Sequence, residues 1–212
     1  MDFSINSKFY HFMSKVADCM ILSVLWLFTS LPLVTIGAAS TALYYCIIKV
    51  IREESGSPVK SFFHAFRNNF KQGVAISLIA IVLCILTTLV GSAVYAFATS
   101  GDTLAGIYFA YLVLLAFGIA WLHYAISYVA RFQASLGTIL KNSLVLCIFH
   151  LPLSLSMMLL LVIVAVAWFM MLPASFMALL LLPAGYAWIS SFLLERIYSK
   201  YLPAEEECEN EA

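Results

Sequence analysis

The sequence predicts an all-α protein, a polytopic transmembrane helix bundle with about six spans. Of its 212 residues, 64% are apolar and 10% are charged, whereas soluble domains carry about 25% charged residues. The apolar residues form long runs without charge, and one span needs about 20 such residues. We therefore expect residues 1–202 to form a single membrane-embedded helical domain, and residues 203–212 to be a disordered acidic tail.

The first charge-free run, Cys19–Ile48, predicts a short helical hairpin. Its 30 residues are too many for one span and fewer than the roughly 40 that two full spans need. Pro32 and Gly37 lie inside the run, and both residue types interrupt helices. We expect one helix to end near Leu31, a turn near the outer face, and a second helix to begin near Ala38. The alternative is one long tilted span, which gives five spans and an outside N-terminus.

The next two runs predict a second pair of spans. One span covers residues 72–98 and the other covers 103–130. Ser100–Asp102 forms the outer turn between them, because it lacks Lys and Arg. Arg131 and Lys141 then bracket a second, smaller cytoplasmic loop.

The last run, residues 142–194, predicts two further spans. Its 53 residues suffice for two helices and a turn. We place the turn at Met171–Ala174 and expect Pro152 and Pro183 to kink the two helices.

The basic segment Lys49–Lys71 sets the expected orientation. It holds five of the eleven Lys and Arg residues, and short basic loops stay in the cytoplasm. Lys8 and Lys15 precede the first span, so the N-terminus is expected inside. With six spans, both termini are then cytoplasmic.

This cytoplasmic loop also predicts an amphipathic helix from Ser57 to Lys71. Ser57 is suited to be the N-cap and Pro58 the first helical residue. Apolar side chains from Val59 to Phe70 fall on one face and basic ones on another, as in a helix at the membrane interface. The expected contacts are lipid or a protein partner. The candidate interaction surface consists of Lys60, Phe62, Phe63, Phe66, Arg67, Phe70 and Lys71.

Two histidines are the candidate polar residues inside the membrane. His123 precedes Arg131 by eight residues and His150 follows Lys141 by nine, which puts each roughly 12–14 Å from the inner end of its helix. Two imidazoles at one depth suit a proton relay or part of a metal site. We favour ordinary hydrogen bonds within the bundle, because a metal needs three or four ligands and no carboxylate or cysteine has suitable spacing.

No constellation in the sequence predicts catalysis. The chain lacks GxxxxGK[ST], GxSxG and HExxH motifs and a paired acidic site. We therefore expect no enzyme activity, catalytic residue, cofactor or metal, and we expect no nucleic-acid partner because topology explains the basic loop. The five cysteines are widely spaced and are expected to be small, buried apolar residues.

One segment resembles a known family. Its most specific stretches are Ser30–Ala38, Ala42–Tyr45, Arg52–Glu54 and Phe62–Gln72, and the similarity covers residues 26–72. These residues resemble the YesL family of small bacterial membrane proteins, which has no established activity.

The resemblance implies a protein of the bacterial plasma membrane. Members are often encoded beside sugar-uptake systems, so it also implies an accessory of carbohydrate uptake, with sugar-transporter permease subunits as partners. The alternative is a small transporter or channel for a neutral solute. The sequence does not indicate an oligomeric state.

Overall fold

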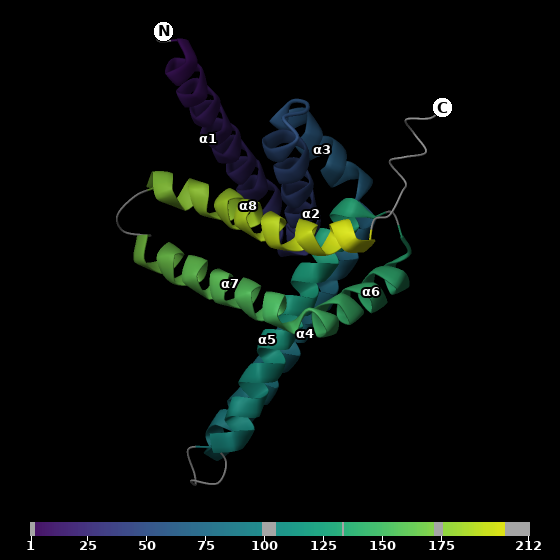
Figure 1. Cartoon of the computed structure of the whole chain (residues 1–212). Coiled ribbons are helices and arrows are strands. Elements are labelled where there is room, and N and C mark those ends of the chain that lie inside the picture. Colours follow the sequence, from purple (N-terminus) through teal and green to yellow (C-terminus); the bar gives the residue numbers. More distant parts are fainter. Residues whose placement is uncertain (1–2, 99–104, 133, 172–175, 202–212) are drawn as a thin grey trace.

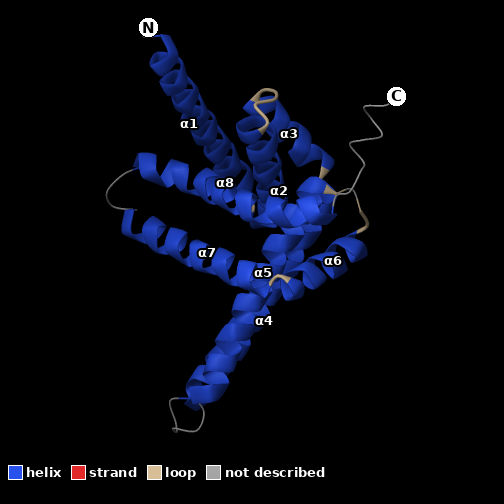
Figure 2. Cartoon of the chain, in the orientation of Figure 1, coloured by secondary structure: helices blue, strands red, loops and turns tan. Residues whose placement is uncertain are grey.

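Every regular element of the computed structural model is helical over the residues it describes, which are 3–98, 105–132, 134–171 and 176–201 (Figures 1 and 2). This confirms the predicted all-α class. The elements are α1 (Phe3–Ser30), the 3-10 turn η1 (Leu33–Thr35), α2 (Ile36–Cys46), the π-helical η2 (Ile47–Arg52), α3 (Pro58–Asn68), α4 (Phe70–Ala98), α5 (Ala105–Arg131), α6 (Leu136–Phe149), α7 (Leu151–Met171) and α8 (Phe176–Tyr201). The expected turn at Ser100–Asp102 and the acidic tail at 203–212 lie outside the described residues.

The predicted hairpin is present as α1 and α2. α1 ends at Ser30, and the chain reverses through Pro32 and η1. The hydroxyl of Thr35 donates to the carbonyl oxygens of Thr29 (2.6 Å) and Pro32 (2.7 Å), which satisfies backbone groups left free at the helix end. The residues before the first apolar run are the first part of α1, which begins at Phe3.

α2 lies at the centre of the helices and contacts α1, α3, α4, α5 and α8. Small residues permit this, since Gly37, Ala38, Ala39 and Ala42 are all buried. Gly37 donates its backbone N–H to the Ser77 hydroxyl of α4 at 2.7 Å, so the helix backbones come very close here. Helices approach this closely in membranes where small residues line the contact.

The α1–α2 turn lies beside the start of α4. η1 packs against α4, and a Cβ built on Gly37 would lie 2.4 Å from the carbonyl oxygen of Gly73. The sequence interpretation put this turn at the outer face and the start of α4 at the inner face. These two placements cannot both hold and are wrong as a pair, because the α1–α2 turn and the start of α4 lie side by side. The far halves of α4 and α5 extend well beyond the α1–α2 turn (Figure 1).

The segment after α5 also differs from the prediction. The expected loop between Arg131 and Lys141 is mostly helical, because α6 begins at Leu136 after the N-cap Ser135. α6 then ends at Phe149, and α7 starts at Leu151 with a bend of 97° between them. The kink predicted at Pro152 is thus a complete break, and the proline lies in the first turn of α7, where it is tolerated.

The fold is that of a multi-pass membrane protein. Four helices in the described part are long and apolar enough to cross a bilayer, and α6 with α7 gives a fifth if this bent pair is one span. Large apolar side chains on these helices are exposed, such as Leu89 (63%), Leu114 (70%) and Leu155 (68%). Lipid, rather than water, suits such surfaces. Six spans and cytoplasmic termini stay predictions.

We expect Gly73→Ala to destabilise the protein. The new Cβ would lie 2.4 Å from the Ala38 Cα, so the backbone of α2 must move. Overpacking of this kind costs about 1–3 kcal/mol. Thermal unfolding of the detergent-purified protein measures the effect. Gly118→Ala on α5 is the control, because its Cβ meets nothing within 4 Å. Equal melting temperatures for the two variants would contradict the close α2–α4 contact.

Candidate functional site

α3 is held against the bundle by a tight turn after η2. Glu54 (φ 53°) and Gly56 (φ 87°) adopt left-handed backbone conformations there, which a residue with a side chain rarely does. Ser57 is extended and Pro58 opens the helix, as predicted. The chain therefore folds back, and α3 packs against α1 and α2.

The predicted helix Ser57–Lys71 is in fact two helices. α3 ends at Asn68, because Asn69 leaves the helical backbone conformation. The Asn69 backbone N–H still makes the last helical bond to the Ala65 carbonyl (3.0 Å), and its side-chain amide donates to the same oxygen (3.2 Å). Phe70 and Lys71 belong to α4. The candidate interaction surface is thus spread over the α3–α4 corner.

Phe62 is not part of any exposed surface, which corrects the prediction. Its side chain is 0% exposed and packs in a core that includes Leu22, Ala42 and Ile47. Phe66 is half-buried, and its ring stacks on that of Phe62 with centroids 6.3 Å apart. These two residues attach α3 to the bundle.

The remaining predicted residues are exposed and form what we call the α3 surface. Phe63 is 49% exposed and Phe70 is 41% exposed. The α3 surface consists of Lys60, Phe63, Arg67, Phe70 and Lys71. It thus combines two accessible aromatic rings with three positive charges.

A polar hollow of about 340 Å³ adjoins this surface. Lys49 of η2 reaches it while donating to the Tyr45 hydroxyl at 3.0 Å. The hollow is lined by Tyr45, Lys49, Lys60, Ser61 and His64. Two lysines beside hydroxyl groups suit a carboxylate or a phosphate.

His123 lies on α5 and faces α8. Its Nδ1 is 3.3 Å from the Tyr186 hydroxyl, and the two rings meet edge to face with centroids 5.3 Å apart. Its other nitrogen, Nε2, is buried and has no hydrogen-bond partner in the part of the chain that is described. The interpretation of an ordinary hydrogen-bonded histidine therefore accounts for only one of the two nitrogens.

His150 occupies the break between α6 and α7. Its backbone N–H donates to the Leu146 carbonyl (3.1 Å), and its carbonyl accepts from the Ser154 N–H (2.9 Å). These bonds connect the two helices across the bend. Among the described residues, no three potential ligands gather as a metal site would require, and the proton relay between the histidines stays untested.

A partly open cavity of about 440 Å³ lies between α1, α2, α5, α7 and α8. His123, Tyr186 and Trp26 line it together with mostly aliphatic side chains. The Trp26 indole N–H donates to the Ser40 hydroxyl at 3.1 Å. Among the aromatics of the chain, Trp26, Tyr44 and Tyr186 border this space.

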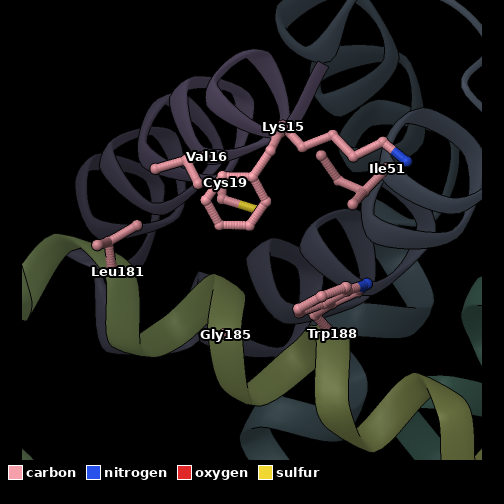
Figure 3. A pocket seen from close by; sticks show the side chains of 8 residues that line it. Lys15, Val16, Cys19, Ile51, Leu181, Gly185 and Trp188 are labelled. Atoms are coloured by element: carbon pink, nitrogen blue, oxygen red, sulfur yellow. The ribbon is translucent and has the colours of Figure 1, made fainter. Parts of the chain in front are cut away.

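An apolar groove of about 560 Å³ lies between parts of α1 and α8. Figure 3 shows Val16 and Cys19 of α1 facing it, with Trp188 and Leu181 of α8 opposite. The Lys15 ammonium is instead paired with Glu54 at 2.7 Å. Such a lining suits a lipid chain more than a polar ligand.

Several polar contacts at the ends of the helices were not predicted. Arg131 of α5 forms a two-bond ion pair with Glu195 of α8, with Nε 2.8 Å from Oε1. Arg52 donates to the Ser191 carbonyl at 3.3 Å. The sequence analysis treated these charges only as markers of helix ends. The opposite charges of Arg131 and Glu195 could have indicated the ion pair.

The cysteines agree in part with expectation. Cys46 and Cys147 are buried, Cys19 is half-buried and Cys84 is exposed, and these four are free thiols. Cys208 lies outside the described residues.

One comparison with known proteins gives a match. The model of a family described as "Protein of unknown function, DUF624" matches residues 19–90, which are 72 of the 212 residues. The matched segment runs from within α1, through α2, η2 and α3, and into α4. No curated protein and no solved structure matches the chain.

We expect Phe62→Ala and Phe63→Ala to differ sharply in their effect on stability. Removing the buried Phe62 ring leaves a cavity, which costs about 3–5 kcal/mol. Phe63 is half-exposed and loses chiefly an edge contact with Phe62, worth about 1 kcal/mol. Unfolding of the two purified variants in detergent provides the comparison. A similar loss for both would show that Phe62 does not anchor α3.

Proposed function

We propose that the chain is a member of the DUF624 family and a non-enzymatic accessory of a carbohydrate uptake system in the bacterial plasma membrane. In this proposal the α3 surface binds a sugar-transporter permease on the cytoplasmic side. The observation that carries the proposal is an aromatic and basic surface that the core of the protein holds in a fixed position.

The composition of the α3 surface supports a protein partner. Aromatic and Arg side chains supply most of the binding energy in protein interfaces, and this surface has Phe63, Phe70 and Arg67. Phe62 and Ala65 fix α3 in the core. Little conformational entropy is then lost when a partner binds, which favours affinity.

A resemblance in the sequence supports the choice of partner. The family match covers all of α3 and the helices that support it. The resemblance of residues 26–72 to YesL proteins supports carbohydrate uptake as the process, because members are often encoded beside sugar-uptake systems.

A second candidate function is a small transporter or channel for a neutral solute. The cavity at His123 is the observation that favours it, since transporters bind substrate between helices. Its mostly apolar lining argues against a path for a hydrated solute.

The accessory proposal predicts co-purification with a permease. We expect the full chain, purified from native membranes in mild detergent, to recover a sugar-transporter permease identified by mass spectrometry. Phe63→Ala is expected to reduce the recovery roughly tenfold or more, as for a central interface residue. Phe109→Ala is the matched control, because Phe109 is an exposed phenylalanine on α5 (69%), away from α3.

Two results would overturn the accessory function. One is the absence of any sugar-transporter permease from the purified material. The other is sugar flux through the purified protein alone in liposomes, which would establish the transporter instead. If the Phe63→Ala variant recovered as much permease as the unmodified chain, the α3 surface would be rejected as the binding site.

A further inference from the structure

We propose that the polar hollow between η2 and α3 binds a phosphate monoester group. The hollow measures about 340 Å³ and is lined by Tyr45, Lys49, Lys60, Ser61 and His64. This inference goes beyond the accessory function, because it concerns a small anion and not a protein partner. Of the five lining residues, only Lys60 also belongs to the α3 surface.

Two lysines from different elements give the hollow its charge, since Lys49 belongs to η2 and Lys60 to α3. Neither ammonium group forms an ion pair within 4 Å in the described part of the chain. Of the two glutamates that follow η2, Glu54 is paired with Lys15 at 2.7 Å, and Glu53 makes no such pair with either lysine. Both positive charges are therefore available to an anion.

The protein holds Lys49 in place at one wall of the hollow. Lys49 lies in the π-helical segment η2, and such segments are rare and occur frequently at functional sites. The apolar residues of η2 are buried, namely Ile47, Ile48, Val50 and Ile51. The Lys49 ammonium donates to the Tyr45 hydroxyl at 3.0 Å, so it keeps two N–H groups for a ligand.

The opposite wall is formed by Ser61 and His64, which flank the residues that fix α3 in the core. Phe62 is 0% exposed and Ala65 is 2% exposed, so the backbone on either side of them is held in place. The side-chain amide nitrogen of Asn68 is 3.0 Å from His64 Nε2. Because that nitrogen is only a donor, Nε2 accepts, and the neutral ring carries its proton on Nδ1. His64 therefore adds a hydrogen-bond donor to the lining.

The first turn of α3 strengthens the preference for an anion. Helix N-termini carry a partial positive charge, which favours acidic groups there. This turn has no acidic residue and holds Lys60 instead, and the Ser57 side chain makes no capping hydrogen bond. A bound anion would offset the charge of the lysine and of the helix end together.

The number of donors favours a phosphate over a carboxylate or a sugar. Lys49 offers two N–H groups, Lys60 offers three, and Ser61 and His64 add further donors. A phosphate monoester presents three strong acceptor oxygens and a charge of about −1.5 to −2 at pH 7, whereas a carboxylate has two oxygens and one charge. A neutral sugar would leave both lysines without a counter-charge.

The same phosphate group occurs on a lipid headgroup and on soluble esters, and a matched set of probes separates these sources. Glycerol 3-phosphate is the headgroup of dioleoyl phosphatidate without its acyl chains. Dioleoylglycerol is the same lipid without its phosphate. Sodium acetate supplies a carboxylate in place of the soluble phosphate.

The binding is measured on the full chain, labelled with 15N-histidine, in dodecyl maltoside micelles, which contain no phosphate. The side-chain nitrogen signals are recorded while each probe is added at constant pH and ionic strength. The chain has four histidines, so the signal of His64 is assigned by its loss in His64→Asn.

We expect phosphatidate, glycerol 3-phosphate or both to shift the His64 signal saturably and to leave that of His150, which is outside the hollow, unchanged. A shift with phosphatidate alone identifies a lipid headgroup, and a shift with glycerol 3-phosphate identifies a soluble ester. Dioleoylglycerol should cause no shift, and acetate should bind at least about tenfold more weakly. The proposal is overturned if neither phosphate compound shifts the signal, or if dioleoylglycerol or acetate acts as well as its phosphate counterpart.

A pair of variants locates the binding at the hollow. Lys49→Gln should weaken the binding of the phosphate probe about tenfold or more, because a charge-assisted hydrogen bond is lost. Lys141→Gln is the matched control, since it removes the same charge from an exposed position on α6, and it should bind as the unmodified chain does. Equal affinities for the two variants would overturn the proposal.

The choice of Lys49 also separates this inference from the accessory function. Lys49 is not part of the α3 surface, so Lys49→Gln should recover the permease as well as the unmodified chain does. Loss of phosphate binding with unchanged permease recovery is the expected result. If Lys49→Gln does not fold, the comparison of the phosphate compounds with dioleoylglycerol and acetate in the unmodified chain still decides.

Discussion

The close contact between α2 and α4 is the constraint on which the remaining structure depends. Gly37 and Gly73 have no side chains, so the two backbones approach until the Gly37 N–H reaches the Ser77 hydroxyl at 2.7 Å. In a bilayer, helices gain little from burying apolar surface, and close backbone packing becomes a main source of association. This contact places α2 in the middle of the bundle, where five other helices touch it.

Both candidate sites are built on α2. The α3 surface keeps its position because Phe62 packs against α2 residues such as Ala42 and Cys46. The cavity uses the same stretch of this helix, since Ser40, Leu43 and Tyr44 line it. A shift of α2 would therefore change the α3 surface and the cavity together, which gives a physical route for coupling between them.

Local signals in the sequence predicted the helical class, the hairpin and the start of α3. Pro32 and Ser57-Pro58 act on their neighbours through backbone sterics, so their effects are visible without the fold. Periodicity placed Phe62 and Phe63 on one apolar face, but only tertiary packing separates the buried ring from the exposed one. The pairs His123–Tyr186 and Arg131–Glu195 join residues more than 60 positions apart, and the depth of the α1–α2 turn depends on a contact with Ser77. Local sequence patterns do not reveal contacts between residues so far apart in the chain.

The most direct test of the account is the side of the membrane to which the α1–α2 turn and the start of α4 are exposed. Leu31→Cys and Lys71→Cys are made separately in a chain whose five native cysteines are replaced by serine. Each is then treated with a membrane-impermeant maleimide in right-side-out and inverted vesicles. Because η1 packs against α4, both positions should react from the same side. Labelling from opposite sides would contradict the α2–α4 contact and restore a hairpin that crosses the whole bilayer.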